Sequence, residues 1–279
     1  MKKVILITGA SSGLGKAIAE NLVKNGHIVY GTSRNVESRG VARNAPTQCA
    51  PTDVKMLLMD VTSRTDIAAA IDKILQAENR LDVVINNAGM GIGGAVELAA
   101  EEEIALQMNT NFFGVVNVCS AVMPHFRKQR KGLIINASSV GGVFALPYQG
   151  FYSASKFAVE GYSEALSLET RQFGINVVII EPGDFNTGFT QSRVISQKSL
   201  ENEDYKTSFE RVLKNIEKDE TNGAKPEYLA KKINKIINKK RPKLRYVITP
   251  NIIQKLSVWL SYILPGRLFQ WIIRLFYSV

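Results

Sequence analysis

Residues 8–15 of this chain read TGASSGLG, and they join an apolar run at residues 4–7 to a helical pattern that begins near Gly15. Glycines in such a turn let a phosphate group approach the backbone, which a Cβ atom would block. The N–H groups at the start of the helix and the helix dipole then attract the phosphate charge. The stretch therefore predicts a strand, a turn and a helix that bind a dinucleotide, although its spacing differs from G-x-G-x-x-G.

Short apolar runs alternate with helical patterns along the rest of the chain, as expected for βαβ units and a parallel sheet covered on both faces. The predicted strands span residues 4–7, 27–31, 56–59, 83–86, 133–137, 177–181 and 244–248. The predicted helices span residues 15–24, 65–77, 101–127, 152–173 and 226–239. Because no repeat or linker interrupts the series, we predict an α/β fold with a Rossmann-type doubly wound parallel sheet of about seven strands, in a single domain over residues 1–279.

Two segments depart from this alternation. Residues 184–221 are rich in polar and charged side chains and have a weak helical pattern, so we expect a mobile flap at the substrate site. Residues 250–279 are apolar and aromatic, and they predict an apolar helical C-terminal extension. The last part of this extension is too short and too interrupted to span a bilayer, and it carries a narrow polar stripe of Arg267, Gln270, Arg274 and Ser278.

The chain has 279 residues, a net charge of +10 and two cysteines, Cys49 and Cys119. Two cysteines cannot form a disulfide framework, and they lack the paired spacing of a zinc site, so we expect a reducing, cytoplasmic location and no metal. Neither histidine lies near a motif. The many basic residues between Lys225 and Arg245 favour a solvated helix face over a membrane or nucleic-acid patch, so we expect no nucleic-acid partner.

The end of the second predicted strand reads YGTSR at residues 30–34. In dinucleotide-binding folds an acid at this place binds the ribose 2′-hydroxyl of NAD, and an arginine accommodates the 2′-phosphate of NADP. This segment has no acid, whereas Arg34 offers a planar fork for phosphate and Ser33 offers a hydroxyl. We therefore predict NADP(H) as the cofactor. The alternative is that Arg34 is an ordinary surface arginine just past a strand.

Residues 152–156 read YSASK, within a predicted helix. Tyr152 and Lys156 are four residues apart and project from one face of that helix, so the ammonium favours the ionised phenol. A free tyrosine titrates near ~10 and is a poor base at neutral pH. A lower pKa would let Tyr152 exchange a proton with a carbonyl or alcohol oxygen. The alternative is an exposed helical pair, because this spacing is common.

The glycine-rich stretch at residues 8–15, the YSASK stretch at residues 152–156 and five further segments resemble the short-chain dehydrogenase/reductase family in their motifs and in their order. The further segments are Asp60-Val61, residues 86–89 (NNAG), Asn111, residues 138–139 (SS) and residues 182–187 (PGDFNT). The resemblance covers residues 4–248. It implies a catalytic tetrad of Asn111, Ser139, Tyr152 and Lys156, in which Asn111 supports a proton-relaying water. Ser138 is the alternative to Ser139, as a supporting partner.

The same resemblance implies contacts with the cofactor along the carboxyl edge of the sheet, where open α/β sheets bind ligands. The glycine-rich turn would receive the pyrophosphate, and the element after the sixth strand would contact the nicotinamide carboxamide. The implied cofactor-binding residues are Gly9, Ser11, Ser12, Gly13, Leu14, Gly15, Ser33, Arg34, Asp60, Val61, Asn87, Ala88, Gly89, Tyr152, Lys156, Pro182, Gly183, Phe185 and Thr187.

The sequence thus predicts an NADP(H)-dependent oxidoreductase that interconverts a carbonyl and a primary or secondary alcohol, with Tyr152 as acid and base. The apolar C-terminal segment resembles that of family members acting on steroids, retinoids or long-chain carbonyl compounds, so we expect a small lipophilic substrate. The alternative is a non-catalytic NADP(H)-binding sensor or regulatory protein, which the intact Ser139, Tyr152 and Lys156 disfavour. Epimerisation or dehydration is disfavoured by the short C-terminal region.

Three uses are open for the apolar face of residues 250–279: a lid over the substrate, a peripheral contact with a membrane, and a subunit interface. We rank them in that order. If the segment contacts a membrane, the protein would be cytoplasmic and associated with that membrane through residues 250–279. We also expect a homo-oligomer.

Overall fold

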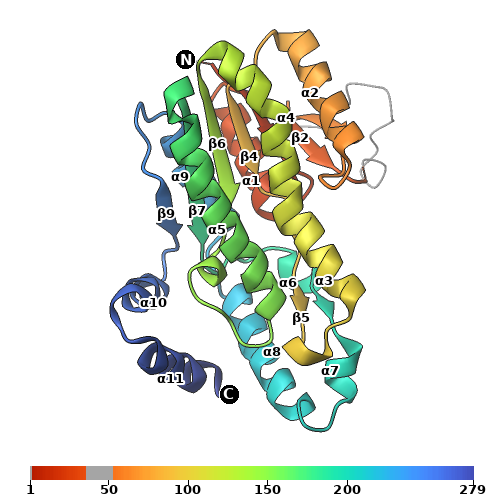
Figure 1. The fold of residues 1–279 in the computed structure, drawn as a ribbon, viewed down its shortest axis with the longest axis vertical. Helices are drawn as coiled ribbons and strands as arrows, with labels where there is room; N and C mark the ends of the chain where they lie inside the picture. The colour runs from red at the N-terminus through yellow and green to blue at the C-terminus, as the bar shows by residue number, and fades with distance from the viewer. Residues whose placement is uncertain (1, 36–52) are drawn as a thin grey trace.

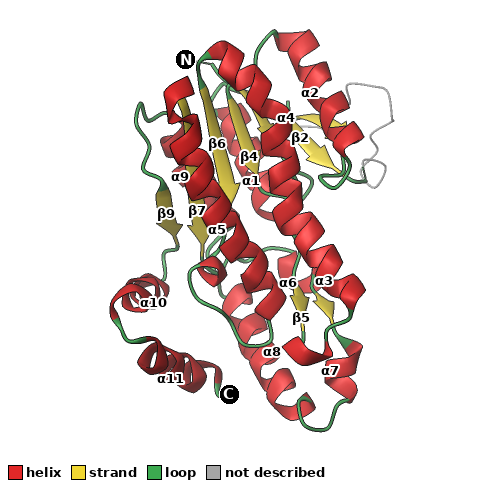
Figure 2. Cartoon of the chain, in the orientation of Figure 1, coloured by secondary structure: helices red, strands yellow, loops and turns green. Residues whose placement is uncertain are grey.

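Seven parallel strands form the centre of the molecule, in the order β3-β2-β1-β4-β6-β7-β9 (Figures 1 and 2). The computed structural model describes residues 2–35 and 53–279, so Cys49 lies outside the described residues. A second, two-stranded sheet pairs β5 (Ile92–Gly93) with β8 (Val194–Ile195). The strands of the large sheet are β1 (Val4–Ile7), β2 (Ile28–Ser33), β3 (Lys55–Leu58), β4 (Val83–Asn86), β6 (Gly132–Ala137), β7 (Ile175–Pro182) and β9 (Arg245–Ile248).

The central strand β1 fixes the arrangement of the sheet. All four of its side chains are buried, which is typical of a parallel strand covered by helices on both faces. Leu6 lies opposite Tyr30 of β2 on one side and Val84 of β4 on the other. The chain passes from β1 to β2 and β3 on one side and then to β4 on the other side, so the strand order reverses between β1 and β4. Open α/β sheets bind ligands beside the carboxyl ends of the strands at such a point.

Helices cover both faces of the sheet, as Figure 1 shows. On one face, Ile18 and Leu22 of α1 and Ile233 of α9 pack in one apolar cluster with strand residues. On the other face, Ile71 of α2 and Val118 of α4 pack in a second cluster. The helices are α1 (Gly13–Lys24), α2 (Arg64–Glu78), α3 (Glu101–Met108), α4 (Gly114–Gln129), α5 (Gly150–Thr170), α6 (Phe189–Ser192), α7 (Gln197–Glu201), α8 (Lys206–Thr221), α9 (Pro226–Ile237), α10 (Ile252–Ile263) and α11 (Gly266–Tyr277).

The fold prediction is confirmed: the structure is a Rossmann-type, seven-stranded parallel sheet with an apolar helical C-terminal extension. Each predicted strand is present, with ends that differ by at most two residues. The extension consists of α10 and α11, which contact each other and lie at the lower left of the molecule in Figure 1. Within the described residues, every helix is too short or too polar to cross a bilayer.

Two predicted segments differ from the structure. The single helix predicted over residues 101–127 is divided into α3 and α4 by a π-helical turn at Asn109–Phe113, because the buried Asn111 side chain bonds to backbone outside the helix. The flap predicted over residues 184–221 is largely helical, and it includes the 16-residue helix α8. Phe209, Val212 and Ile216 of α8 recur at helical spacing and are buried.

Candidate active site

The glycine-rich turn between β1 and α1 has the geometry that a phosphate group needs. Gly9 and Gly13 have positive φ angles of 66° and 52°, which favour glycine. A Cβ on Gly9 would lie 2.9 Å from Cα of Ala88, and one on Gly15 would collide with the Gly9 carbonyl. Ser12 caps α1 without a side-chain hydrogen bond, and the first turn of α1 contains no acid. The turn therefore leaves a helix N-terminus suited to an anion.

The ends of β1 and β4 are tied together beside this turn. The Thr8 hydroxyl accepts hydrogen bonds from the backbone N–H groups of Asn87 (3.0 Å) and Ala88 (2.9 Å). The Asn87 side chain donates in return to the carbonyl oxygens of Thr8 and Gly9, both at 3.1 Å. The NNAG segment is thus fixed against the end of β1 and the glycine-rich turn. Ser11 and Leu14, also predicted cofactor contacts, lie half-buried in the turn and in the first turn of α1.

The predicted adenosine side of the site lies at the ends of β2 and β3. Arg34 is exposed directly after β2, and the Ser33 hydroxyl donates to the carbonyl of Asn35 (3.1 Å). Asp60 follows β3 and accepts hydrogen bonds from Thr62. Val61 is buried. These side chains lie at the same carboxyl edge of the sheet as the glycine-rich turn.

The segment after β7 approaches the glycine-rich turn from the opposite side. A Cβ on Gly13 would lie 3.6 Å from Cβ of Thr187, which places the two residues in direct contact. Pro182 ends β7, and a Cβ on Gly183 would collide with Gln254 of α10. Phe185 is buried. The structure therefore brings residues 182–187 beside the turn.

Tyr152, Ser139 and Lys156 meet where β6 ends and α5 begins. A Cβ on Gly141 would lie 3.3 Å from the Tyr152 ring and 3.6 Å from Ser139 Oγ, so these two side chains lie close together. The Ser139 hydroxyl accepts a hydrogen bond from the Gly141 N–H (3.1 Å). Lys156 Nζ lies 5.7 Å from the centre of the Tyr152 ring and donates to the Ala137 carbonyl (2.9 Å). Ser138, the alternative to Ser139, lies behind them and donates to the Lys156 carbonyl (3.5 Å).

Asn111 is held in the π-helical turn between α3 and α4. Its Oδ1 accepts from the Met90 N–H, and its Nδ2 donates to the Met90 carbonyl, both at 2.9 Å. The same Nδ2 donates to the Ser155 hydroxyl (3.1 Å). A Cβ on Gly89 would lie 3.3 Å from Asn111 Oδ1 and 3.7 Å from Lys156 Nζ, so both groups face Gly89. The four predicted catalytic side chains therefore lie in one site. Such π turns are frequent at functional sites.

Burial controls the protonation of this site. It raises the pKa of the Tyr152 phenol above its usual value, opposite to the lower pKa expected from the sequence, while the neighbouring Ser139 acts to lower that pKa. Burial lowers the pKa of the Lys156 ammonium to about 8, against the attraction of the Glu160 carboxylate. A phenol that stays protonated is a proton donor at neutral pH, and a lysine with this pKa changes charge within the working range.

Several residues beside Tyr152 have no signal in the sequence. The Phe189 ring lies 6.1 Å from the Tyr152 ring, and the buried Arg193 pairs with Glu220 of α8. Asp184 follows Gly183, and its burial, with the nearby Glu220 and Asp219 carboxylates, raises its pKa to about 6. These side chains come from the segment predicted as a flap, where a polar composition does not distinguish a buried ion pair from a solvated surface.

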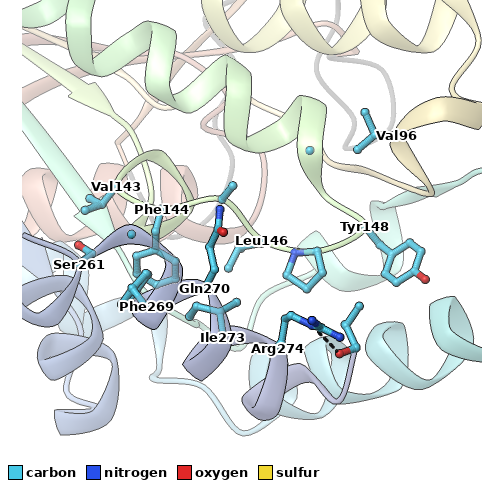
Figure 3. Close-up of a pocket in the computed structure, with 15 residues that line it drawn as sticks. Val96, Val143, Phe144, Leu146, Tyr148, Ser261, Phe269, Gln270, Ile273 and Arg274 are labelled. Atoms are coloured by element: carbon cyan, nitrogen blue, oxygen red, sulfur yellow. Dashed lines mark hydrogen bonds between the residues drawn. The ribbon is translucent and has the colours of Figure 1, made fainter. Parts of the chain in front are cut away.

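An apolar cavity of about 530 Å³ lies between α11 and the loop from η4 (Val140–Gly142) to α5 (Figure 3). Phe144 and Phe269, both in its lining, meet edge to face with their ring centres 5.2 Å apart. The catalytic side chains are not in this lining, but Leu146 is, and a Cβ on Gly141 would lie 3.3 Å from both Leu146 and the Tyr152 ring. Its polar lining includes Gln270 and Arg274 of α11. The arrangement can hold an apolar chain next to the phenol.

Comparison with known proteins relates this site to a large family. A sequence profile described as short chain dehydrogenase matches residues 3–198. The 3-ketodihydrosphingosine reductase of Bacteroides thetaiotaomicron is 53% identical over 277 residues, which cover 99% of this chain and 98% of that protein. Human 17-beta-hydroxysteroid dehydrogenase type 1 is 31% identical over 269 residues, which cover 93% of this chain and 81% of that protein.

Solved structures share the whole fold. The crystal structure of a short-chain dehydrogenase from Streptomyces avermitilis superposes with a TM-score of 0.80 at 31% identity, covering 97% of this chain and 96% of that chain. A short chain dehydrogenase/reductase from Burkholderia phymatum, in complex with NAD, gives a TM-score of 0.77 at 25% identity, covering 93% of this chain and 92% of that one.

Proposed function

This chain belongs to the short chain dehydrogenase family, and we propose that it is an NADPH-dependent reductase of a long-chain, lipophilic ketone. As a member of that family it is an oxidoreductase with a nicotinamide dinucleotide as cofactor. One observation carries the proposal: Tyr152 and Ser139 lie together around Gly141 and next to Leu146, which lines an apolar cavity of about 530 Å³. Reduction of a sphingoid 3-ketone is the first candidate reaction, because of the similarity to the Bacteroides enzyme.

The residues present fit the cofactor. The uncapped start of α1 and the glycines at positions 9 and 15 form a cradle that a Cβ would fill. We assign this cradle to the pyrophosphate, and residues 182–187 to the nicotinamide side. Arg34 and Ser33 would hold a 2′-phosphate, which favours NADP(H) over NAD(H). When bound there, the nicotinamide would supply the hydride for reduction of the carbonyl carbon.

The side chains of this site then move one proton. Ser139 donates a hydrogen bond to the carbonyl oxygen, and Tyr152 donates its proton to that oxygen as the negative charge develops. The ammonium of Lys156 stabilises the resulting phenolate through its charge, at the separation seen here. Asn111 holds the Gly89 side of the site, where a water would connect Lys156 to solvent. Burial of Lys156 away from water strengthens its interaction with the phenolate.

The experiment is a reduction assay with NADPH and a panel of ketones that includes 3-ketodihydrosphingosine, steroid ketones and small polar keto acids. We expect turnover of the long-chain ketone and formation of the corresponding alcohol. Tyr152→Phe should lower kcat by roughly 10²- to 10⁴-fold while NADPH still binds. Binding of NADPH without turnover of any ketone would instead favour a sensor, and activity confined to small polar acids would contradict the lipophilic substrate.

A further inference from the structure

The C-terminal helices α10 and α11 carry most of the exposed large hydrophobic side chains of the described residues. Of the eighteen large hydrophobic side chains that are exposed there, eleven lie in residues 252–279. Both tryptophans of the protein, Trp259 and Trp271, are among them, and each is more than half exposed. Contiguous apolar surface of this kind marks an interaction site in a folded protein.

An ordinary surface helix exposes its polar side to solvent, whereas α10 exposes its apolar side. Its polar Gln254 points inward, where it accepts a hydrogen bond from the Thr249 hydroxyl (2.7 Å) and donates to Asp184. Val258, on the same inner side, is buried. The outward residues recur at helical spacing and are all exposed: Ile252, Leu256, Trp259 and Ile263. The solvent side of α10 is therefore its apolar side.

Helix α11 has two apolar faces with different surroundings. Phe269 and Ile273 line the apolar cavity, as Figure 3 shows. Leu268, Trp271 and Leu275 lie on the opposite face at helical spacing and are exposed. The cavity thus accounts for the apolar residues on the inner face of α11 only. The apolar residues on its outer face point to a second, different apolar partner.

The charge of this region identifies that partner. Residues 228–279 contain eleven Lys and Arg and no Asp or Glu, although the net charge of the whole chain is only +10. They form α9, β9, α10 and α11, which run along one side of the molecule in Figure 1. Lys255 of α10 and Arg267 of α11 are exposed beside the apolar residues. An anionic surface with an apolar interior complements this combination.

We propose that the outward faces of α10 and α11 dock on the surface of an anionic phospholipid bilayer, with both helices lying in the plane of the interface. Tryptophan and tyrosine favour this boundary because their rings are amphipathic, and Trp259, Tyr262 and Trp271 are exposed on these helices. A symmetric contact between two copies of the chain through the same surface would instead bring Lys255 and Arg267 close to like charges. The bilayer is therefore the better partner.

The two tryptophans make the test direct, because the protein has no others. We would record the fluorescence of the full chain during titration with phosphatidylcholine vesicles, and with vesicles that also contain phosphatidylglycerol. We expect a blue shift and co-flotation with the anionic vesicles, and release at high salt, because screening weakens the attraction. The absence of a shift and of flotation with anionic vesicles would overturn the proposal, without any need for a variant.

Variants separate the surface from the rest of the fold. Leu256→Ser/Leu268→Ser/Leu275→Ser keeps both tryptophans and should lower the vesicle partition coefficient about tenfold or more. A matched control changes three leucines of similar exposure on β3, α3 and α5, Leu58→Ser/Leu106→Ser/Leu168→Ser, and should bind as the parent does. Equal loss in both variants would contradict the proposal. Circular dichroism and NADPH reduction of a short ketone verify the fold of each variant.

Charge and self-association supply the remaining readouts. Lys255→Glu/Arg267→Glu should lower the partition into anionic vesicles by roughly fivefold for each cation removed, and should change binding to phosphatidylcholine vesicles little. Analytical ultracentrifugation without lipid tests the other partner. A tryptophan shift that follows protein concentration in the absence of vesicles, and that the triple serine variant abolishes, would replace the bilayer by a second copy of the chain.

Discussion

The Lys156 ammonium lies 5.7 Å from the centre of the Tyr152 ring, while its hydrogen bond is made with the Ala137 carbonyl at 2.9 Å. The described structure thus contains no direct hydrogen bond between the two side chains. An ammonium at this separation in a water-poor site still favours the phenolate. Its influence on Tyr152 depends on whether Lys156 carries its proton, and the low pKa of Lys156 makes that a function of pH.

Reduction should therefore decline as Lys156 loses its proton. Its pKa is about 8, so the lysine is charged below that pH and neutral above it. We expect kcat/KM for ketone reduction to fall above about pH 8 with one ionisation. In Lys156→Arg this decline should disappear, because a guanidinium stays charged, even if the variant is slower at every pH. Lys16→Arg, on the exposed side of α1, is the control. An unchanged alkaline decline in Lys156→Arg would contradict the assignment.

Replacing Arg34 tests the cofactor preference. Arg34→Asp exchanges a phosphate-binding fork for a repelling carboxylate, so NADPH affinity should fall roughly 10- to 100-fold. NADH affinity should change little, because NADH has no 2′-phosphate. Dissociation constants from cofactor fluorescence titration give both values. Arg171→Asp, at an exposed position after α5, should affect neither cofactor. A similar loss of both cofactors would refute the NADP(H) preference.

Filling the cavity should change the selectivity between substrates. Ile273→Trp adds a bulky ring to the lining of the cavity, so kcat/KM for a long-chain ketone should fall about tenfold, because overpacking and lost burial act together. A short ketone that does not reach α11 should react as before. Leu275→Trp, on the exposed side of the same helix, is the matched control. If the long and short ketones slow equally in Ile273→Trp, the cavity does not hold the chain.

Asp184 should make the protein less stable at neutral pH than at mildly acidic pH. Its pKa in the folded protein is about 6, above the usual 3.8, so the folded state keeps this proton when the unfolded chain has already lost it. The contribution of Asp184 to the free energy of unfolding therefore falls as the pH rises from about 4 to about 6. Asp184→Asn removes the charged form while retaining an oxygen that accepts from Gln254.

Urea unfolding at pH 4.5 and pH 7 measures this effect. Asp184→Asn should be more stable than the parent by about 1–2 kcal/mol at pH 7, and the gain should shrink toward pH 4.5. The exposed Asp204→Asn serves as the control and should behave as the parent at both values. A gain of equal size at both pH values would indicate a packing effect and not a titration.

Much of the fold could be predicted because the residues that form each βαβ unit are close together in the sequence. The alternation of apolar runs and helical patterns predicts strands such as β1 and β4 within one or two residues, since a strand buried on both faces must be apolar throughout. The segment over residues 101–127 was less well predicted. A π turn at Asn109–Phe113 depends on what Asn111 bonds to, and its partner Met90 lies 21 residues away.

By itself, the sequence determined which chemical groups follow which strand: a glycine-rich turn suited to phosphate after β1, polar groups at the ends of the following strands, and a Tyr-Lys pair on one helix. These features are local, and the carboxyl ends of parallel strands necessarily share one edge. Only the tertiary structure decided the pairing of Arg193 with Glu220, the cavity under α11 and the outward turn of the apolar faces of α10 and α11. Each of these depends on contacts between segments far apart in the chain, and a periodic pattern states that a helix has an apolar face without stating where that face points.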